Sequence, residues 1–369
     1  MEDNKAEEIK RAVLGRYSAH ARQRLASLEE TGTPCCGPAQ PRVSETSSCA
    51  CSPAPSAGAD LNLAEQLYSV EEYKHPEALA TTEWLAAHLD DPSVRVVDMR
   101  YSVRAASGGS FQGVLGRKAY HQGHIPGAVF VDFASDLADP EDEVPFNILS
   151  PDRFDALMGC LGIGSDSTVV VYDDSGGTWA ARLWWALRYY GHDAAKVLNG
   201  GLTKWTAEGR PLERRTPTPP PATFRARVRP ALRATCNEVI QAIGRRDVCI
   251  VDALPEMFYS GKARLFPTHR ADHIPTALNV PATANVDQAT QTLLTADDLA
   301  RLWRKVGLNP DQRVITYCGS GAYAAFDLFV LYVLGHEKVS LYDGSWMEWG
   351  ANPELPVETG SGDKILDSN

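Results

Sequence analysis

Short runs of β-branched and apolar residues alternate along this chain with longer stretches in which apolar residues recur at helical spacing. The strand-like runs are VRVVD at 94–98, VVVY at 169–172, CIVD at 249–252 and VITY at 314–317. Helical stretches cover 180–190 and 324–334, and each is followed by a glycine, Gly191 or Gly335, of the kind that ends helices. Continuous apolar strands alternating with helices predict an α/β fold, in which helices cover both faces of a parallel sheet.

The second half of the chain repeats the first in a degenerate form. Four pairs of segments carry the repeat: VRVVDMR at 94–100 and VCIVDAL at 248–254, HQGHIPGAV at 121–129 and RADHIPTAL at 270–278, residues 168–192 and residues 313–336, and NGGLTKW at 199–205 and DGSWMEW at 343–349. The period is far longer than that of a solenoid repeat. We therefore expect each copy to be a domain and the chain to be a tandem duplication.

The same pattern divides the chain into five parts. They are an N-terminal extension at 1–75, a first α/β domain at 76–212, a linker at 213–230, a second α/β domain at 231–360 and a tail at 361–369. We expect the extension to be partly helical and partly disordered, because its Pro-, Gly-, Ser- and Cys-rich part has few large apolar residues to bury. The linker is rich in proline and arginine, which favours an extended conformation.

Composition and charge narrow the class of protein. The 369 residues include 47 acidic and 36 basic ones, for a formal net charge of -11, and no basic segment suggests nucleic-acid binding. No apolar run reaches the roughly 18 residues of a membrane span. The N-terminus lacks the apolar stretch of a signal peptide. We expect a cytoplasmic enzyme with no nucleic-acid or membrane partner.

Cys318 is the strongest candidate for chemistry. It follows a predicted strand and precedes a predicted helix, so the intervening loop turns successive N–H groups toward one point, where the helix dipole adds positive charge. The predicted N–H donors belong to Gly319, Gly321, Ala322, Tyr323 and Ala324. A thiol in such a site is stabilised as the nucleophilic thiolate. The alternative is an inert cysteine at the end of a core strand.

The first copy differs at the corresponding position, where it has Asp173. An aspartate cannot form a persulfide, so we expect an inactive first domain and an active second one. Together with the paired HIP segments and the DGSWMEWG sequence at 343–350, this arrangement resembles the two-domain rhodanese-type sulfurtransferases over roughly residues 76–360. The family order, an inactive domain followed by a catalytic one, agrees.

The resemblance implies an enzyme that moves a sulfane sulfur through a Cys318 persulfide, without metal or organic cofactor. The implied donor is 3-mercaptopyruvate or thiosulfate, and the implied acceptor is a thiol, cyanide or a thioredoxin-type protein. The CGSG sequence at 318–321 resembles the 3-mercaptopyruvate group, and Ser320 would supply a hydroxyl for proton transfer, with His124 as a second member of the relay. The chain departs from the family at Ala322-Tyr323, where Val-Thr is usual.

The resemblance also implies an arginine that binds the carboxylate of the donor, because the planar guanidinium matches that group. The candidates are Arg182, which by family position faces the cleft between the domains, and Arg264 and Arg270 in the second domain. Met257 stands near the place where the family has its usual arginine.

Two other functional classes compete with the sulfurtransferase. A phosphatase or arsenate reductase of the Cys-x5-Arg type needs an arginine where this chain has Ala324, which argues against it. A non-catalytic protein that binds sulfur or a metalloid is the alternative. It rests on four possible soft-metal thiols in the extension, Cys35, Cys36, Cys49 and Cys51. Their segment resembles the leader of bacterial arsenite methyltransferases, and both an arsenite sensor and a disordered remnant fit it.

Overall fold

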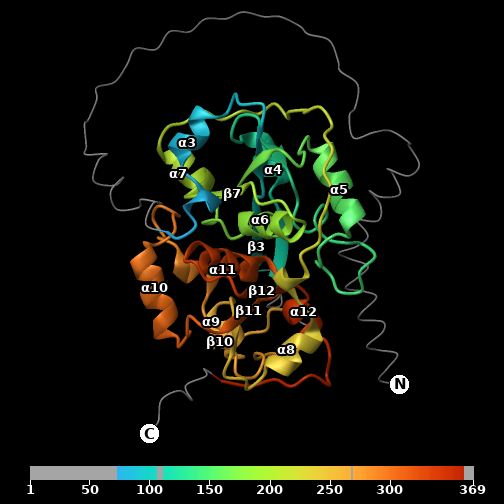
Figure 1. Cartoon of the computed structure of the whole chain (residues 1–369), viewed down its shortest axis with the longest axis vertical. Coiled ribbons are helices and arrows are strands. Elements are labelled where there is room, and N and C mark those ends of the chain that lie inside the picture. The colour runs from blue at the N-terminus through green and yellow to red at the C-terminus, as the bar shows by residue number, and fades with distance from the viewer. Residues whose placement is uncertain (1–72, 106–110, 267–268, 361–369) are drawn as a thin grey trace, which may run out of the picture.

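The computed structural model describes residues 73–105, 111–266 and 269–360, which form two α/β domains, one for each copy of the repeat (Figure 1). Each domain contains one five-stranded sheet in which all neighbouring strands are parallel. The prediction of tandem parallel-sheet domains is therefore confirmed. The cysteines of the extension, and the helix predicted there, lie outside the described residues.

The sheet of the first domain has the strand order β1-β7-β6-β2-β5. Its strands are β1 (Leu79–Ala80), β2 (Val94–Asp98), β5 (Val129–Phe130), β6 (Thr168–Tyr172) and β7 (Ala195–Leu198). The helices are η2 (Pro76–Ala78), α3 (Thr82–Ala87), α4 (Arg117–Gln122), α5 (Pro151–Cys160), α6 (Ala180–Tyr189) and α7 (Gly201–Ala207). A separate antiparallel sheet of two strands, β3 (Tyr101–Ala105) and β4 (Phe111–Leu115), also belongs to this domain and was not predicted from the sequence pattern.

The second sheet has the order β10-β9-β11-β12-β8, which is the topology of the first sheet read from its other edge. Its strands are β8 (Arg233–Ala234), β9 (Val248–Asp252), β10 (Leu278–Asn279), β11 (Arg313–Tyr317) and β12 (Val339–Tyr342). Around it lie η3 (Pro230–Leu232), α8 (Cys236–Ala242), α9 (Glu256–Tyr259), η4 (Ala282–Asn285), α10 (Ala296–Lys305), α11 (Ala322–Val333) and α12 (Ser345–Trp349).

Both faces of each sheet are buried, which explains the continuous apolar runs. In β6, Val169 and Val171 belong to the core cluster that contains α6, whereas Val170 and Tyr172 pack on the opposite face with residues of α3 and α7. A strand covered on one face would instead alternate apolar and polar residues.

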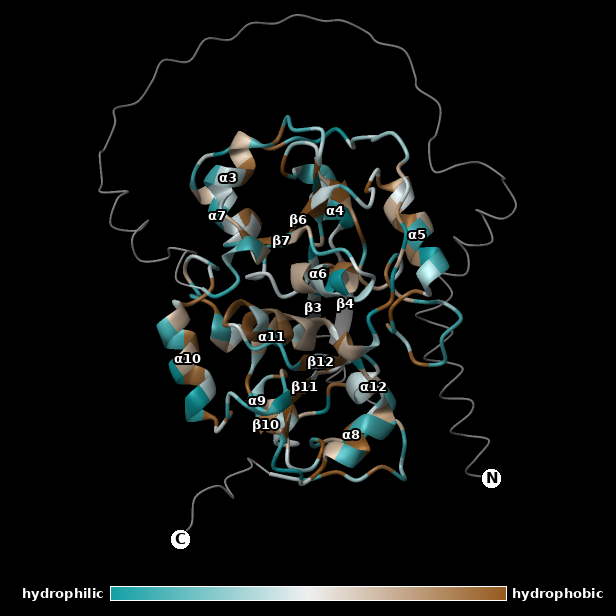
Figure 2. Cartoon of the chain, in the orientation of Figure 1, coloured by the Kyte–Doolittle hydropathy of each residue, from teal (hydrophilic) through white to brown (hydrophobic). Residues whose placement is uncertain are grey.

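The two domains share one hydrophobic core, because α6 and α11 pack against each other at their boundary (Figures 1 and 2). Trp184 of α6 meets Phe329 of α11 edge to face, with 4.8 Å between ring centroids. The guanidinium of Arg188 lies 3.9 Å from the ring centroid of Tyr332. Helix α11 begins directly after the loop that carries Cys318, so this interface also positions the candidate site.

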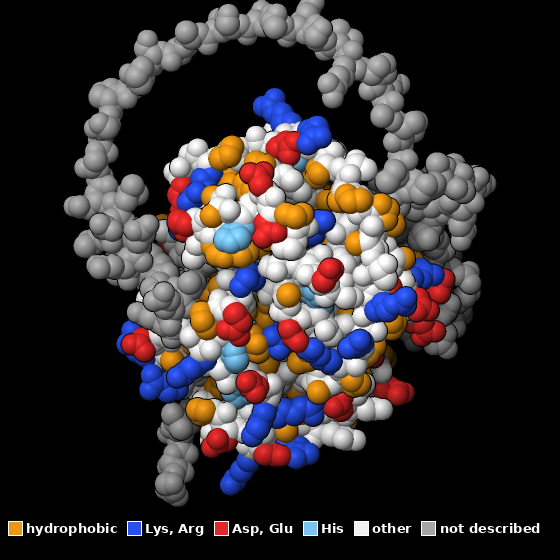
Figure 3. Space-filling view, turned by 45° about the horizontal axis from the view of Figure 1, so that its top comes forward, with side chains coloured by type: hydrophobic (Ala, Val, Ile, Leu, Met, Phe, Trp, Pro, Cys, Tyr) orange, Lys and Arg blue, Asp and Glu red, His pale blue; other side chains and the backbone are white. Residues whose placement is uncertain are grey.

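The segment between the two domains and the molecular surface have the following features. Residues 213–230, all of them described, form no helix or strand before η3 begins at Pro230, and the segment is tied to the first domain by the bond from Ala222 N to Gly159 O (3.0 Å). Basic and acidic side chains are interspersed on the face shown in Figure 3. Within the described part of the chain, no helix is long and apolar enough to cross a bilayer.

Candidate active site

Cys318 lies at the carboxyl end of β11, the central strand of the second sheet, in a loop of four residues, 318–321, which we call the cysteine loop. Ligands of open α/β sheets collect at this end of the strands. The Cys318 side chain is 2% exposed, and its Sγ accepts a hydrogen bond from Gly321 N at 3.2 Å. Of the five predicted N–H donors, Gly321 therefore makes a hydrogen bond to the sulfur.

Two glycines allow the cysteine loop to take this shape. Gly321 has a φ of 82°, and a Cβ there would lie 2.7 Å from Nη1 of Arg182. A Cβ on Gly319 would lie 2.4 Å from Cδ2 of Leu265. Any larger residue at either position would displace the loop or its neighbours.

The segment DGSW at 343–346 and the residue after it form hydrogen bonds to the backbone of the cysteine loop. Ser345, fully buried at the start of α12, accepts a hydrogen bond on its Oγ from Cys318 N at 3.1 Å. Trp346 N donates to Cys318 O at 2.9 Å, and Met347 N donates to Gly319 O at 3.0 Å. Sequence reasoning did not assign Ser345 to the site, although its place in the repeated segment at 343–349 was the available signal.

Burial changes the predicted state of the thiol. It raises the pKa of the Cys318 thiol, whereas the N–H groups of Ala324, Ser320 and Gly321 act in the opposite direction. The net direction is upward, so in this fold burial opposes the thiolate that the loop is predicted to stabilise. The N–H groups offset only part of the cost of placing a negative charge in a buried site.

The first copy shows the same loop with a carboxylate in it. Its Asp173 takes the place of the cysteine and accepts four backbone hydrogen bonds of 2.7–2.9 Å, from the N–H groups of Ser175, Gly177, Trp179 and Ala180. Burial raises the pKa of this carboxyl too, while the N–H groups of three of those residues lower it. A strand-to-helix loop of this kind therefore directs its donors at the side chain that follows the strand, in both copies.

In the second copy the buried carboxyl of Asp252 lies close enough to the Cys318 thiol for its charge to act on it. In the first copy Arg100 bonds Asp98 at 2.7 Å. In the second copy Asp252 corresponds to Asp98, and Leu254 occupies the position that corresponds to Arg100. Among the described residues, Asp252 therefore forms no ion pair. Burial raises the pKa of Asp252 to about 7, and its charge contributes to raising the pKa of Cys318. Protonation of Asp252 therefore favours the thiolate.

The structure corrects the assignment of Arg182 as a residue open to the cleft. Its side chain is fully buried, its Nη1 lies 2.6 Å from Oδ1 of Asp343, and its Nη2 donates to Phe146 O at 2.9 Å. The other carboxylate oxygen of Asp343 accepts from Ile148 N of the first domain at 3.0 Å and lies 3.2 Å from Nη2 of Arg233. Arg182 thus joins the first domain to the back of the cysteine loop and is not free to bind a donor.

His124 and Arg270 also have structural contacts in place of the predicted ones. His124 is fully buried, stacks on Tyr120 and bonds Tyr120 O through Nδ1 at 2.9 Å. Arg270 donates to the carbonyl oxygens of Leu355, Trp349 and Asn352. Both side chains are committed to the backbone of their own domain, so the geometry does not support a role in substrate binding.

Arg264 and Ser320 are predicted substrate-site residues that are not fully buried. Arg264 is exposed and precedes Leu265, whose side chain reaches Gly319 of the cysteine loop. Ser320 is half-buried and directs its N–H toward Cys318. Among the described residues, no group of three His, Cys, Asp or Glu side chains is placed to hold a metal ion.

Comparison with known proteins finds a family model that matches both halves of the chain and proteins that are similar over most of its length. A family model described as a rhodanese-like domain matches residues 81–208 and again 235–352. The chain is 36% identical over 277 residues to 3-mercaptopyruvate sulfurtransferase of Escherichia coli K12, covering 75% of this chain and 96% of that protein. It is 34% identical over 299 residues to the sulfur carrier protein TtuD of Thermus thermophilus, covering 78% and 99%.

Two solved structures are also similar to this chain. SseA from Escherichia coli, described as a 3-mercaptopyruvate sulfotransferase, is similar with a TM-score of 0.65 and 33% identity, over 73% of this chain and 98% of that one. An EanB variant in complex with ergothioneine has a TM-score of 0.68 at 24% identity, over 78% and 71%. The second similarity concerns the fold alone.

Proposed function

This chain belongs to the rhodanese-like domain family, and from that membership we propose that it is a sulfurtransferase that carries sulfur on Cys318. The observation that supports this most strongly is the contrast between the two copies of the loop. One copy surrounds a carboxylate that cannot react with sulfur, and the other surrounds a thiol that can.

The proposed reaction has two halves. In the first, the Cys318 thiolate attacks the sulfur of the donor, and a new S–S bond forms while the C–S bond of 3-mercaptopyruvate or the S–S bond of thiosulfate breaks. The electron pair leaves with the enolate of pyruvate or with sulfite. In the second half, an acceptor attacks the outer sulfur of the persulfide, and the Cys318 thiolate leaves. The N–H groups of the cysteine loop stabilise the negative sulfur in both halves.

We propose 3-mercaptopyruvate as the preferred donor. The cysteine loop contains no cation that would attract the thiosulfate dianion, whereas Ser320 offers a hydroxyl that can protonate the leaving enolate. Arg264 is exposed and directly precedes Leu265 and Phe266, whose side chains lie against Gly319. It is the remaining candidate among the three arginines for binding the donor carboxylate.

Steady-state kinetics test this proposal directly. Initial rates with 3-mercaptopyruvate and thiosulfate, each measured at several acceptor concentrations, should give the parallel double-reciprocal lines of a ping-pong mechanism. The catalytic efficiency should be higher for 3-mercaptopyruvate. Intersecting lines would contradict a covalent sulfur intermediate, and a preference for thiosulfate would contradict the donor assignment.

A second candidate function is that of a sulfur carrier, which receives sulfur and delivers it to a protein rather than to a small acceptor. The burial of Cys318 and the similarity to TtuD favour it. The two functions separate when the persulfide form is mixed with an excess of a small thiol or cyanide. Repeated turnover supports the enzyme, and a persulfide that only a protein acceptor can discharge supports the carrier.

A further inference from the structure

The neighbours of the cysteine loop show from which side a donor can reach Cys318. At Gly321 the loop meets Arg182 and Asp343, which are both buried. On another side its backbone is bonded to the first residues of α12, which are buried as well. These two sides of the loop are therefore closed to water.

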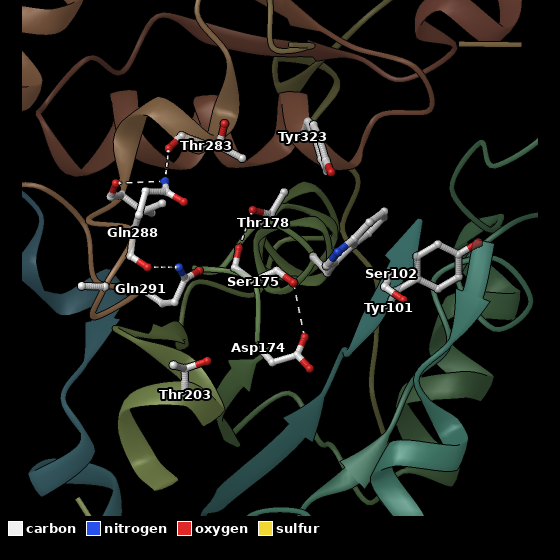
Figure 4. Close-up of a pocket in the computed structure, with 13 residues that line it drawn as sticks. Tyr101, Ser102, Asp174, Ser175, Thr178, Thr203, Thr283, Gln288, Gln291 and Tyr323 are labelled. Atoms are coloured by element: carbon white, nitrogen blue, oxygen red, sulfur yellow. Dashed lines mark hydrogen bonds between the residues drawn. The ribbon is translucent and has the colours of Figure 1, made fainter. Parts of the chain in front are cut away.

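The cavity between the two domains does not lead to the loop either. It has a volume of about 480 Å³ and lies beside the first-domain loop that contains Asp174, Ser175 and Thr178 (Figure 4). Tyr323 of α11 reaches its wall, but none of the described residues that line it belongs to the cysteine loop. A molecule in this cavity would not contact the loop that carries the sulfur.

Gly319 is the part of the loop that faces partly exposed side chains. A Cβ at this position would lie 2.4 Å from Cδ2 of Leu265 and 3.4 Å from Cζ of Phe266, and both of these residues are half-buried. Ser320, the next residue of the loop, is half-buried too. Because Cys318 itself is only 2% exposed, a donor has to approach it past this part of the loop.

Leu265 is the side chain in the tighter position. It packs against the core cluster that contains Cys318, whereas Phe266 packs against the other core cluster of the second domain. The ring of Phe266 also contacts that of His269, with 5.0 Å between ring centroids, and Nε2 of His269 lies 3.0 Å from Met347 O. Phe266 is thus tied toward α12, and Leu265 lies nearer to the loop.

We infer that Leu265 is a specificity-determining residue, which limits the width of the sulfur donor at Cys318. The inference rests on the proposed sulfurtransferase function. A branched side chain packed this closely against a glycine leaves little free space beside the loop, so a narrow donor fits and a wide one clashes. In an apolar pocket, even one methylene changes specificity by roughly 10- to 200-fold.

Two thiosulfonate anions of different width test this inference. Methanethiosulfonate and benzenethiosulfonate react in the same way: the Cys318 thiolate attacks the outer sulfur, a new S–S bond forms, the bond to the sulfonyl sulfur breaks, and the electron pair leaves with the sulfinate. No further oxidant or reductant is consumed. Both donors carry one negative charge, so an attraction to Arg264 cancels in the ratio of their rates.

The second-order rate of sulfur loading onto Cys318 of the full chain is measured with each donor. Leu265→Ala should raise the ratio of the benzenethiosulfonate rate to the methanethiosulfonate rate at least about tenfold, because the approach to the loop becomes wider. Leu265→Phe should lower this ratio. The matched control is Leu302→Ala, which shortens another half-buried leucine that packs against the same core cluster but belongs to α10. Its ratio should equal that of the parent protein, since a ratio within one variant cancels any loss of folded protein.

An unchanged or lower ratio in Leu265→Ala, or an equal rise in Leu302→Ala, would overturn the inference. So would a Leu265→Phe variant with the ratio of the parent protein. These results differ from a failure of the proposed function, in which the parent protein would take up no sulfur on Cys318 from either donor.

Discussion

The ion pair between Arg182 and Asp343 should contribute strongly to stability, and its removal tests how the first domain supports the cysteine loop. Arg182→Met keeps much of the apolar volume of the side chain and removes the charge. Both partners are at most 1% exposed and 2.6 Å apart, so the variant leaves the carboxylate of Asp343 buried, with only Arg233 and Ile148 N as remaining partners. Breaking a buried pair by removing one partner typically costs about 3–5 kcal/mol. Because Arg233 compensates in part, we expect about 3 kcal/mol.

The free energy of unfolding is measured by urea titration followed by tryptophan fluorescence. The matched control is Arg229→Met, which breaks an exposed Arg–Asp pair to Asp193 and should cost at most about 1 kcal/mol. Adding Asp343→Leu to Arg182→Met should restore part of the loss, because the buried carboxylate is then gone and Arg233, which loses the same partner, has a side chain that is 30% exposed to water. Equal, small losses in Arg182→Met and Arg229→Met would refute the reasoning, and so would a double variant less stable by the sum of the two single losses.

Three further predictions concern the site and the extension. Ser320→Ala should reduce turnover of 3-mercaptopyruvate on the order of a hundredfold, and turnover of thiosulfate much less, because only the former has an enolate to protonate; equal losses would contradict that role. Asp252 has a folded-state pKa raised to about 7, above its ordinary value of about 3.9, so its contribution to stability is present below about pH 4 and lost as pH rises to about 7. The stability of Asp252→Asn relative to the parent, from urea titrations, should therefore rise over that range, and a constant difference would contradict the assignment. A chain shortened to begin at His75 should keep its sulfurtransferase activity, since every residue of the proposed site follows it; a large loss in the standard assay would place the extension in the enzyme.

The sequence predicted those strands and helices whose residues form a recognisable hydrophobic pattern within one short segment. The four apolar runs lie within β2, β6, β9 and β11, and the two helical stretches correspond to α6 and α11. These elements are buried on every side, so their hydrophobicity shows directly in the sequence. The β3–β4 ribbon was missed because its strands pair with each other outside the sheets, where no apolar run is needed.

The candidate site was predicted only in part, because its groups come from distant segments. Cys318 and its loop follow one another in the sequence, and the duplication shows which copy carries the thiol. The pairing of Arg182 with Asp343 joins residues 161 positions apart in different domains. Their contact depends on how α6 and α11 pack, which no local pattern specifies. The raised pKa of Cys318 likewise results from its burial in the folded chain, which no local pattern shows.

His124 shows the opposite error, in which a local pattern suggested chemistry that the packing does not support. A histidine before Ile-Pro occurs in both copies, and in both the ring stacks on a tyrosine and bonds the carbonyl of that tyrosine. The repetition of the same contacts at His273 identifies a structural element of the domain. A histidine with a role in catalysis would be needed in only one copy.

The central claim, that Cys318 carries the transferred sulfur, is tested most directly by mass spectrometry of the protein after treatment with 3-mercaptopyruvate or thiosulfate without acceptor. We predict one added sulfur atom, about 32 Da, on the peptide that contains Cys318, its loss on addition of a thiol, and neither the sulfur nor the activity in Cys318→Ser. The other cysteines of the described residues, Cys160, Cys236 and Cys249, should remain unmodified. Sulfur on one of those three residues, or a Cys318→Ser protein that keeps most of its activity, would contradict the account.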